Sequence, residues 1–385
     1  MTTETAFRIE KKNPTVQGIC LVIVVCVTVG YLIDGDRKSF VASAQPVQLI
    51  KPKENADDAG QCSSSKRHPT YQCLPTSLLI GVQKGGTGEL ILWLGSHPKI
   101  HFDPREVRYF QTEQLERWGT YVRRPAFRLS PSEVRGGHIT MEKSPGYARL
   151  HCRAAPRIQL KMPSAKLIII LRDPAKRAYS GFQHHCGRQR VMQKGDGTVY
   201  FKGPSTTLGA KRAPCTAKTF DRLIQKFKRY LIETNRSGTD LVSKWAESNT
   251  CFSPHDDYME DPYHIFSTGF YPAVFSEYWR RFNHSQLLVI FSEEFTAAPK
   301  EVLYQIEEYL SLEHASYEAH KNQNGFWVLD GKTGRRSKGN RARYPPANAE
   351  AMRFLNEFYR PSVQALMKML PEHKANFDKW LIEPH

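Results

Sequence analysis

Residues 78–92 read LLIGVQKGGTGELIL, in which two apolar runs flank a glycine-rich turn. The pattern predicts a buried strand over Ser77–Gln83 and a helix over Thr87–His97. Backbone N–H groups of such a turn, with the positive end of the helix dipole behind them, form a site for an anion. Lys84 adds a positive charge within the turn. We therefore predict an anion-binding turn; the alternative is a tight connection that needs glycine only for its backbone angles.

The order of residues in this turn differs from the P-loop of nucleoside triphosphatases. That motif is GxxxxGK[ST], in which the lysine follows the glycines. Here Lys84 precedes Gly85 and Gly86, and Thr87 follows them. A P-loop kinase or nucleotidase is therefore an alternative that the order disfavours, and no metal-binding aspartate stands at a recognisable place.

A second stretch, Lys166–Phe182, reads KLIIILRDPAKRAYSGF. Its first six residues predict a buried strand, and Asp173 followed by Pro174 predicts the start of a helix. Arg172 falls at the carboxyl end of the strand, where α/β sheets bind ligands, and Ser180 lies on the helix. An arginine and a hydroxyl suit a phosphate. The alternative is an ordinary ion pair between Arg172 and Asp173.

Further apolar runs alternate between strand and helix patterns. The sequence predicts strands over His138–Lys143 and Gln286–Phe291, and helices over Phe220–Ile232, Pro299–Leu310 and Asn348–Leu370, the last broken near Pro361. This alternation is typical of an α/β domain with a largely parallel sheet flanked by helices.

The N-terminus predicts a membrane anchor. Residues 16–33 carry no charge and are just long enough to span a thin bilayer, and basic residues precede them. We expect a cytosolic tail over residues 1–15, a transmembrane signal anchor over 16–33, a lumenal stem over 34–74 and a catalytic domain over 75–385. A cleaved signal peptide is the alternative, and either places the domain in the secretory pathway.

Charge and cysteine usage agree with that location. The net charge of +17 and pI of about 9.5 favour a polyanionic partner, and the absence of nucleic-acid-binding motifs makes nucleic acid the weakest candidate. Outside the apolar span there are six cysteines, whose pairing the sequence leaves open: Cys62, Cys73, Cys152, Cys186, Cys215 and Cys251. No CxxC pair is present, so we expect no metal site of that kind. Asn235 and Asn283 begin glycosylation triplets.

One segment interrupts the strand–helix alternation. Gly187–Arg212 is rich in glycine, lysine and arginine and predicts an inserted basic loop. The loop could touch an anionic substrate, or it could be a solvated loop without a partner.

Several motifs together resemble one family. GVQKGGTGELILWLGSHP is similar to the 5′-phosphosulfate loop of the Golgi sulfotransferases that modify glycosaminoglycans, and IILRDPAKRAYSGF is similar to their 3′-phosphate motif. ITMEKSPGY resembles their strand beside the substrate, residues 269–295 resemble the segment before their last core strand, and SKGNRARYPP and FLNEFYRP resemble their C-terminal cofactor loop and terminal helix. The resemblance is collinear over roughly residues 77–370. It lies nearest the heparan sulfate glucosaminyl sulfotransferases and the N-acetylgalactosamine 4-sulfate 6-O-sulfotransferase group.

The resemblance implies a P-loop-like sulfotransferase fold and a sulfuryl donor, 3′-phosphoadenosine 5′-phosphosulfate (PAPS). It implies that the 5′-phosphosulfate is held by Lys84, Gly85, Gly86, Thr87 and Gly88, and the 3′-phosphate by Arg172 and Ser180. A C-terminal loop would close over the donor through Lys338, Gly339 and Asn340. The family commonly has arginine where this chain has Asn340, and the heparan enzymes have a disulfide hairpin before the loop that GFWVLDGKTGRRS lacks.

The resemblance also implies an acceptor side. Glu106 would be the catalytic base, with Lys84 steadying the leaving phosphate. Arg108 stands where the heparan enzymes have histidine; it cannot act as a base and would hold Glu106 or bind a substrate anion. Glu142 and Lys143 would orient Glu106 and the acceptor, unless they form an ion pair at a strand end. His101 and Glu142 are the next candidates if Glu106 is not the base.

The predicted function is therefore O-sulfation of a glycosaminoglycan or related anionic glycan by a type II Golgi membrane enzyme, with the donor product PAP released and no metal required. N-sulfation and tyrosine sulfation are less favoured variants. A membrane receptor that binds sulfated glycans without catalysis is a further alternative.

Overall fold

The structure is a computed structural model that describes residues 58–64, 69–112, 115–187, 191–193, 195, 199–201, 211–249, 251–252, 264–323, 325, 327–330 and 344–382. The predicted cytosolic tail, the predicted anchor over residues 16–33 and most of the predicted stem lie outside these residues. Within the described residues, no helix has the length and apolar character needed to cross a membrane.

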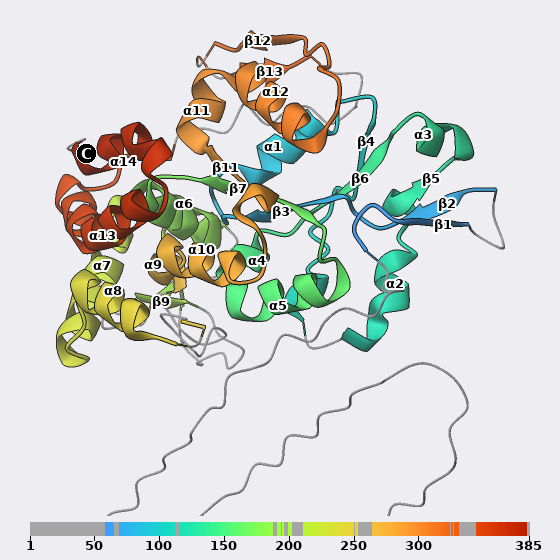
Figure 1. The fold of residues 1–385 in the computed structure, drawn as a ribbon. Coiled ribbons are helices and arrows are strands. Elements are labelled where there is room, and N and C mark those ends of the chain that lie inside the picture. Colours follow the sequence, from blue (N-terminus) through green and yellow to red (C-terminus); the bar gives the residue numbers. More distant parts are fainter. Residues whose placement is uncertain are drawn as a thin grey trace, which may run out of the picture. The chain divides into compact units, whose positions relative to one another are not determined.

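Five parallel strands form the central sheet (Figure 1). Their spatial order is β11–β7–β3–β6–β4, with bounds Leu287–Phe291, Lys166–Leu171, Ser77–Gly81, Ile139–Lys143 and Ile100–Phe102. Every neighbouring pair runs parallel, and the sequence had predicted this α/β class. From β3 the chain first builds the β6–β4 side and then crosses to the β7–β11 side. The carboxyl end of β3 is therefore a topological switch point, where sheets of this kind bind ligands.

Side chains alternate between the two faces of the sheet and enter two separate cores. Leu78, Ile80, Leu167 and Ile169 belong to the larger core, whereas Leu79 and Ile168 belong to the smaller one. This is the period-2 alternation of a strand that is buried on both faces. The larger core packs against α5 (His151–Lys161), α6 (Pro174–Gly187), α7 (Ala217–Glu233), α10 (Tyr271–Trp279), α13 (Ala349–Met369) and α14 (Lys374–Ile382), and the smaller against α1 (Thr87–Leu94) and α12 (Pro299–Leu310).

Shorter elements complete the described fold. The helices are α2 (Trp118–Val122), α3 (Pro131–Arg135), α4 (Gly146–Arg149), α8 (Gly238–Glu247), α9 (His264–Ser267) and α11 (Ser292–Ala297). The strands are β1 (Cys62–Ser64), β2 (Tyr71–Cys73), β5 (Arg128–Leu129), β8 (Val191–Gln193), β9 (Val199–Phe201), β10 (Lys211–Arg212), β12 (Ala319–Lys321) and β13 (Trp327–Leu329).

The long C-terminal helix differs from its prediction. The sequence predicted a break near Pro361, but α13 continues through this proline from Ala349 to Met369. Proline removes one backbone hydrogen bond from a helix and disfavours its interior. Here the buried side chains of Tyr359, Val363 and Leu366 lie on both sides of the proline and anchor the helix to the larger core. Tertiary packing therefore outweighs the local penalty.

The folded portion begins earlier than Pro75, where the sequence had placed its start. β1 and β2 form an antiparallel hairpin within the predicted stem, and β2 also pairs with β5. A disulfide joins Cys62 to Cys73 across the hairpin. Residues 58–64 and 69–74 therefore belong to the same folded unit as the sheet.

Two more disulfides pair the remaining four cysteines, Cys152 with Cys251 and Cys186 with Cys215. The second closes the segment that the sequence predicted to be a basic loop. Its described residues form a small antiparallel sheet, β10–β8–β9, rather than a featureless loop. Three disulfides in one chain are typical of an oxidising compartment.

Asp173 caps α6, as its place before Pro174 predicted. Its Oδ1 accepts hydrogen bonds from the backbone N–H groups of Ala175 at 2.8 Å and Lys176 at 3.1 Å. We predict that Asp173→Ala lowers the free energy of unfolding by about 0.5–2 kcal/mol, because these N–H groups lose their acceptor. Asp173→Asn retains an equally good cap and is the control. Chemical denaturation of the two variants measures the difference, and equal losses in both would contradict the capping role.

Candidate active site

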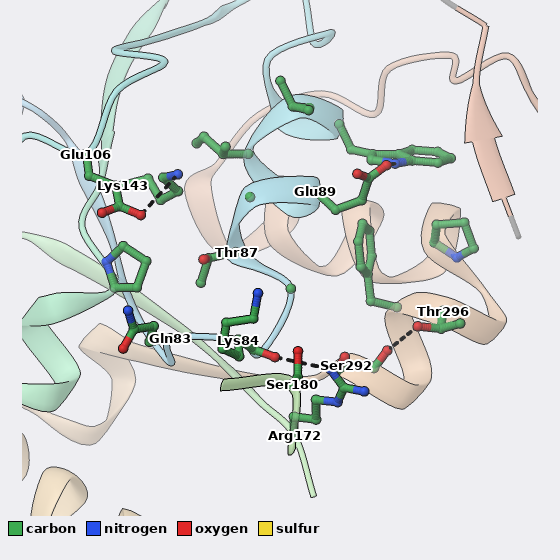
Figure 2. Close-up of a pocket in the computed structure, with 18 of the residues that line it drawn as sticks. Gln83, Lys84, Thr87, Glu89, Glu106, Lys143, Arg172, Ser180, Ser292 and Thr296 are labelled. Atoms are coloured by element: carbon green, nitrogen blue, oxygen red, sulfur yellow. Dashed lines mark hydrogen bonds and ion pairs between the residues drawn. The ribbon is translucent and has the colours of Figure 1, made fainter. Parts of the chain in front are cut away.

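A cavity of about 590 Å³ opens at the carboxyl ends of β3, β6 and β7. Four groups of residues line it, namely the turn after β3, the end of β7 with α6, a pair on the β6 side and an aromatic wall. Figure 2 shows Lys84 and Thr87 between the Glu106–Lys143 pair on one side and Arg172 with Ser180 on the other. The structure thus brings together residues that lie far apart in the sequence.

The turn after β3 depends on two glycines. A Cβ at Gly85 would lie 2.5 Å from the backbone oxygen of Ile170 on β7, so this position admits no side chain without movement of the backbone. Gly86 has φ 111°, a left-handed conformation that favours glycine, and it directly precedes α1. The turn therefore packs closely against β7, and the first residues of α1, Thr87 and Gly88, line the cavity.

Arg172 is tied to the same turn. Its Nη1 donates a hydrogen bond to the backbone oxygen of Lys84 at 3.3 Å, while the Tyr271 hydroxyl holds the Arg172 carbonyl at 2.7 Å. Asp173 is occupied in capping α6 and lies 4.0 Å from Lys176. Ser180, on α6, is buried and lines the cavity. The sequence-predicted pair Arg172 and Ser180 therefore lines the same cavity as the glycine-rich turn.

Glu106 lines the cavity from the loop after β4. Its carboxylate pairs with the Arg108 guanidinium at 2.5 Å and with the Lys143 ammonium at 3.8 Å. Burial lowers the pKa of Lys143, and the Glu106 charge opposes that shift. Arg108 thus holds Glu106, one of the two roles expected for it. His101 does not line the cavity; its ring contacts His138 and Glu133 instead.

Glu142 is not available to a substrate, which corrects its predicted role. Its side chain is fully buried, and its carboxylate accepts hydrogen bonds from the hydroxyls of Tyr121 at 2.5 Å, Tyr147 at 2.5 Å and Ser144 at 2.8 Å. Burial raises its pKa, and the three hydroxyls oppose that shift. Successive residues of a strand face opposite sides, so Lys143 lines the cavity while Glu142 points into the core.

The Glu142 cluster nevertheless reaches the loop that carries Glu106. Ser144 Oγ accepts a hydrogen bond from the Arg108 backbone N–H at 2.8 Å, and the Tyr147 hydroxyl accepts one from the Phe110 N–H at 3.3 Å. The buried carboxylate therefore orients two hydroxyls that hold the end of this loop.

An aromatic wall, formed by Trp93, Phe295 and Trp327, was not predicted. Trp93 and Phe295 meet edge to face with ring centroids 6.0 Å apart. From the sequence alone these aromatic residues are expected to pack in the core, since Trp93 lies on an apolar helix. Trp327 carried the one usable signal, because it lies in the GFWVLDGKTGRRS segment that leads into the stretch resembling the cofactor loop.

The remaining predicted residues fall into two groups. Lys338, Gly339 and Asn340 lie outside the described residues, so their closing role stays a prediction. Asn235 and Asn283 are exposed, as glycosylation would require.

Comparison with known proteins identifies the family. The sulfotransferase domain family matches residues 74–327, and the chain therefore belongs to that family. This membership supports the sulfotransferase prediction over the P-loop kinase alternative.

Curated relatives are heparan sulfate enzymes by name. The chain is 26% identical over 337 residues to the bifunctional heparan sulfate N-deacetylase/N-sulfotransferase 4 of Mus musculus, covering 84% of this chain and 33% of that protein. It is 26% identical over 340 residues to the corresponding enzyme 3 of Homo sapiens, with the same coverage. The chain thus spans about a third of the length of these relatives.

Solved structures include a sulfotransferase from Alicyclobacillus acidocaldarius. It has a TM-score of 0.49 and 19% identity, and the match covers 77% of this chain and 96% of that one. The sulfotransferase domain of the curacin biosynthetic pathway has a TM-score of 0.34 and 15% identity, and covers 63% of this chain and 76% of that one.

We predict that Glu142→Gln lowers the free energy of unfolding by about 1–3 kcal/mol, because an amide N–H₂ would replace one of the two oxygens that accept buried hydroxyl hydrogen bonds. Chemical denaturation measures the change. Glu313→Gln is the control, since that carboxylate is exposed and pairs with Lys99 at the surface. Equal stabilities of the two variants would mean that the hydroxyl cluster does not depend on the carboxylate.

Proposed function

We propose that this chain transfers a sulfuryl group from PAPS to a hydroxyl of a glycosaminoglycan or related glycan, releasing PAP. The observation that carries the proposal is the cavity in which Lys84 lies between Glu106 on one side and Arg172 with Ser180 on the other. A donor with two separate anionic groups needs two separate anion sites, which the turn around Lys84 and the pair Arg172 and Ser180 would supply.

The donor site is proposed from the groups that line the cavity. Lys84, Gly85, Gly86, Thr87 and Gly88 would bind the 5′-phosphosulfate through the turn and the α1 N-terminus. Arg172 and Ser180 would bind the 3′-phosphate by charge-assisted hydrogen bonds. The aromatic wall suits a planar purine. Lys338, Gly339 and Asn340 are proposed to close over the donor.

The transfer step needs a base, an in-line acceptor and a cation at the leaving group. The acceptor oxygen bonds to sulfur, the bond between sulfur and the phosphate oxygen breaks, and the hydroxyl proton passes to Glu106. Lys84 neutralises the charge that develops on the departing phosphate. Arg108 and Lys143 orient Glu106 and favour an anionic acceptor. These roles parallel phosphoryl transfer and require no metal.

N-sulfation is the second candidate, because the relatives named above are N-sulfotransferases. The two candidates share the donor site and differ in the acceptor atom. The names of those relatives also support an anionic polysaccharide as the acceptor.

We further propose a type II Golgi membrane protein with a lumenal catalytic domain. The apolar run over residues 16–33 supports the anchor. The three disulfides and the exposed Asn235 and Asn283 support a lumenal, glycosylated domain.

The full chain, supplied with PAPS carrying labelled sulfate, tests the reaction against heparan sulfate, N-sulfated heparosan, chondroitin and chondroitin 4-sulfate. Disaccharide analysis of the labelled product separates O- from N-sulfation. We expect label on one polymer and thermal stabilisation by PAP but not by ATP–Mg²⁺. Failure of PAP to bind would overturn the sulfotransferase proposal, and stabilisation by ATP–Mg²⁺ would favour a kinase.

We predict that Glu106→Gln reduces turnover by about 10²–10⁴-fold while PAP binding remains, because only the proton acceptor is lost. Lys84→Ala should impair both turnover and PAP binding. Glu313→Gln is the control, because that carboxylate is exposed, pairs with Lys99 and does not line the cavity. Near-normal turnover of Glu106→Gln would show that another group is the base.

The glycine-rich turn supplies a second test of the donor site. Gly85→Ala should abolish PAP binding, because its Cβ would lie 2.5 Å from the Ile170 oxygen. Gly181→Ala on α6 is the control and should retain binding, because a Cβ there meets the Ile265 side chain at an ordinary 3.5 Å and Gly181 does not line the cavity. Calorimetric titration with PAP measures both, and equal affinities would mean that the close packing of the turn on β7 is not needed for donor binding.

A further inference from the structure

A second cluster of chemically active side chains lies outside the donor cavity. His101 on β4, Glu133 on α3 and His138, just before β6, gather on one side of the sheet edge. His101 Nε2 lies 3.0 Å from His138 Nδ1 and 3.6 Å from a Glu133 oxygen, and the three ligand atoms all lie within 4.8 Å of one another. None of the three lines the cavity that binds the proposed donor.

These separations fit the ligands of one transition-metal ion. In tetrahedral zinc sites the metal–nitrogen and metal–oxygen distances are roughly 2.0–2.2 Å, which places neighbouring ligand atoms roughly 3.3 Å apart. The His101–His138 separation of 3.0 Å and the His101–Glu133 separation of 3.6 Å lie on either side of that value. Two imidazoles and one carboxylate are a ligand set that zinc accepts, with the fourth position left to water, whereas magnesium and calcium prefer oxygen ligands throughout.

The cluster can be reached from solvent. About one third of the His101 and Glu133 side chains is exposed, which leaves a path for an ion and its water.

The Glu133 carboxylate is also oriented by a hydrogen bond outside the cluster. Glu133 Oε2 accepts a hydrogen bond from the Ser130 backbone N–H at 2.6 Å within the capping box of α3. The other oxygen, Oε1, is the one that faces His101. Contacts of this kind hold ligand side chains in place around protein metal sites.

The position of the cluster gives a bound ion a structural consequence. β4 has three residues and is an edge strand of the described sheet, paired with β6. An ion held by His101, Glu133 and His138 would join β4 to α3 and to the start of β6. It would thereby stabilise the edge strand from which the Glu106 loop departs.

We propose that His101, Glu133 and His138 form a binding site for one zinc-like divalent transition-metal ion, which fastens β4 to the sheet. The site is separate from the transfer chemistry, so this proposal does not depend on the proposed function.

Cobalt(II) and zinc titrations of the metal-free full chain test the site. We expect one equivalent of Co²⁺ with the absorption bands of a four-coordinate ion, displaced by Zn²⁺, and a Tm that rises with zinc concentration. His138→Ala should lose this equivalent. His314→Ala is the control, because that ring is exposed and stacks on Tyr304 away from the cluster.

Glu133→Gln keeps the test decisive if His138→Ala fails to fold. Glutamine can preserve the capping box, so the helix start is retained while the anionic ligand is lost. We expect at least about tenfold weaker Zn²⁺ binding with an unchanged metal-free Tm. Absence of the Co²⁺ bands in the wild-type chain, or equal Zn²⁺ affinity in wild type and Glu133→Gln, would overturn the proposal.

Discussion

The close approach of the turn after β3 to the end of β7 is the constraint on which the rest of the site depends. Three contacts define it: the Val82 N–H donates to the Ile170 oxygen at 3.0 Å, Gly85 packs against the same oxygen, and Arg172 reaches back to the Lys84 carbonyl. Because β3 and β7 pair in parallel, the turn and Arg172 emerge on the same edge. The start of α1 and the first turn of α6 are consequently fixed relative to each other, as binding of the proposed donor at both of its anionic groups would require.

This part of the fold could be predicted from the sequence because its determinants are local. An apolar run, a glycine-rich turn and a second apolar run specify strand, turn and helix within 16 residues, Ser77–Leu92, and the same holds for β7 and α6. The family resemblance placed Glu142 and Lys143 together on the acceptor side, although successive residues of a strand face opposite sides. What the sequence could not indicate was which of the two faces the core, since that depends on Tyr121, Ser144 and Tyr147 being assembled from other elements.

Other features escaped prediction because they rest on tertiary contacts. The continuity of α13 through Pro361 depends on buried neighbours that belong to several helices. The sequence of the β1–β2 hairpin is polar and predicted a stem. In the structure the pairing of β2 with β5 and the disulfide between Cys62 and Cys73 hold this hairpin in the folded unit. The aromatic wall joins residues from α1, α11 and β13, and its members resemble ordinary core residues in the sequence. Pairing of the cysteines likewise follows from the packing and not from their spacing.

The loop that carries Glu106 is restrained at both ends, which explains how an exposed side chain can keep a defined place. At its start, buried Asp103 accepts hydrogen bonds from the Arg124 guanidinium at 2.9 Å and from the Arg105 backbone N–H at 3.0 Å. At its end, the Arg108 N–H is held by Ser144, which is itself oriented by Glu142. Between these anchors Glu106 is exposed, and among the described residues its carboxylate forms ion pairs with Arg108 and Lys143. Exposed ion pairs alone contribute little to order, so the position of Glu106 follows chiefly from the buried carboxylates at the two ends of its loop.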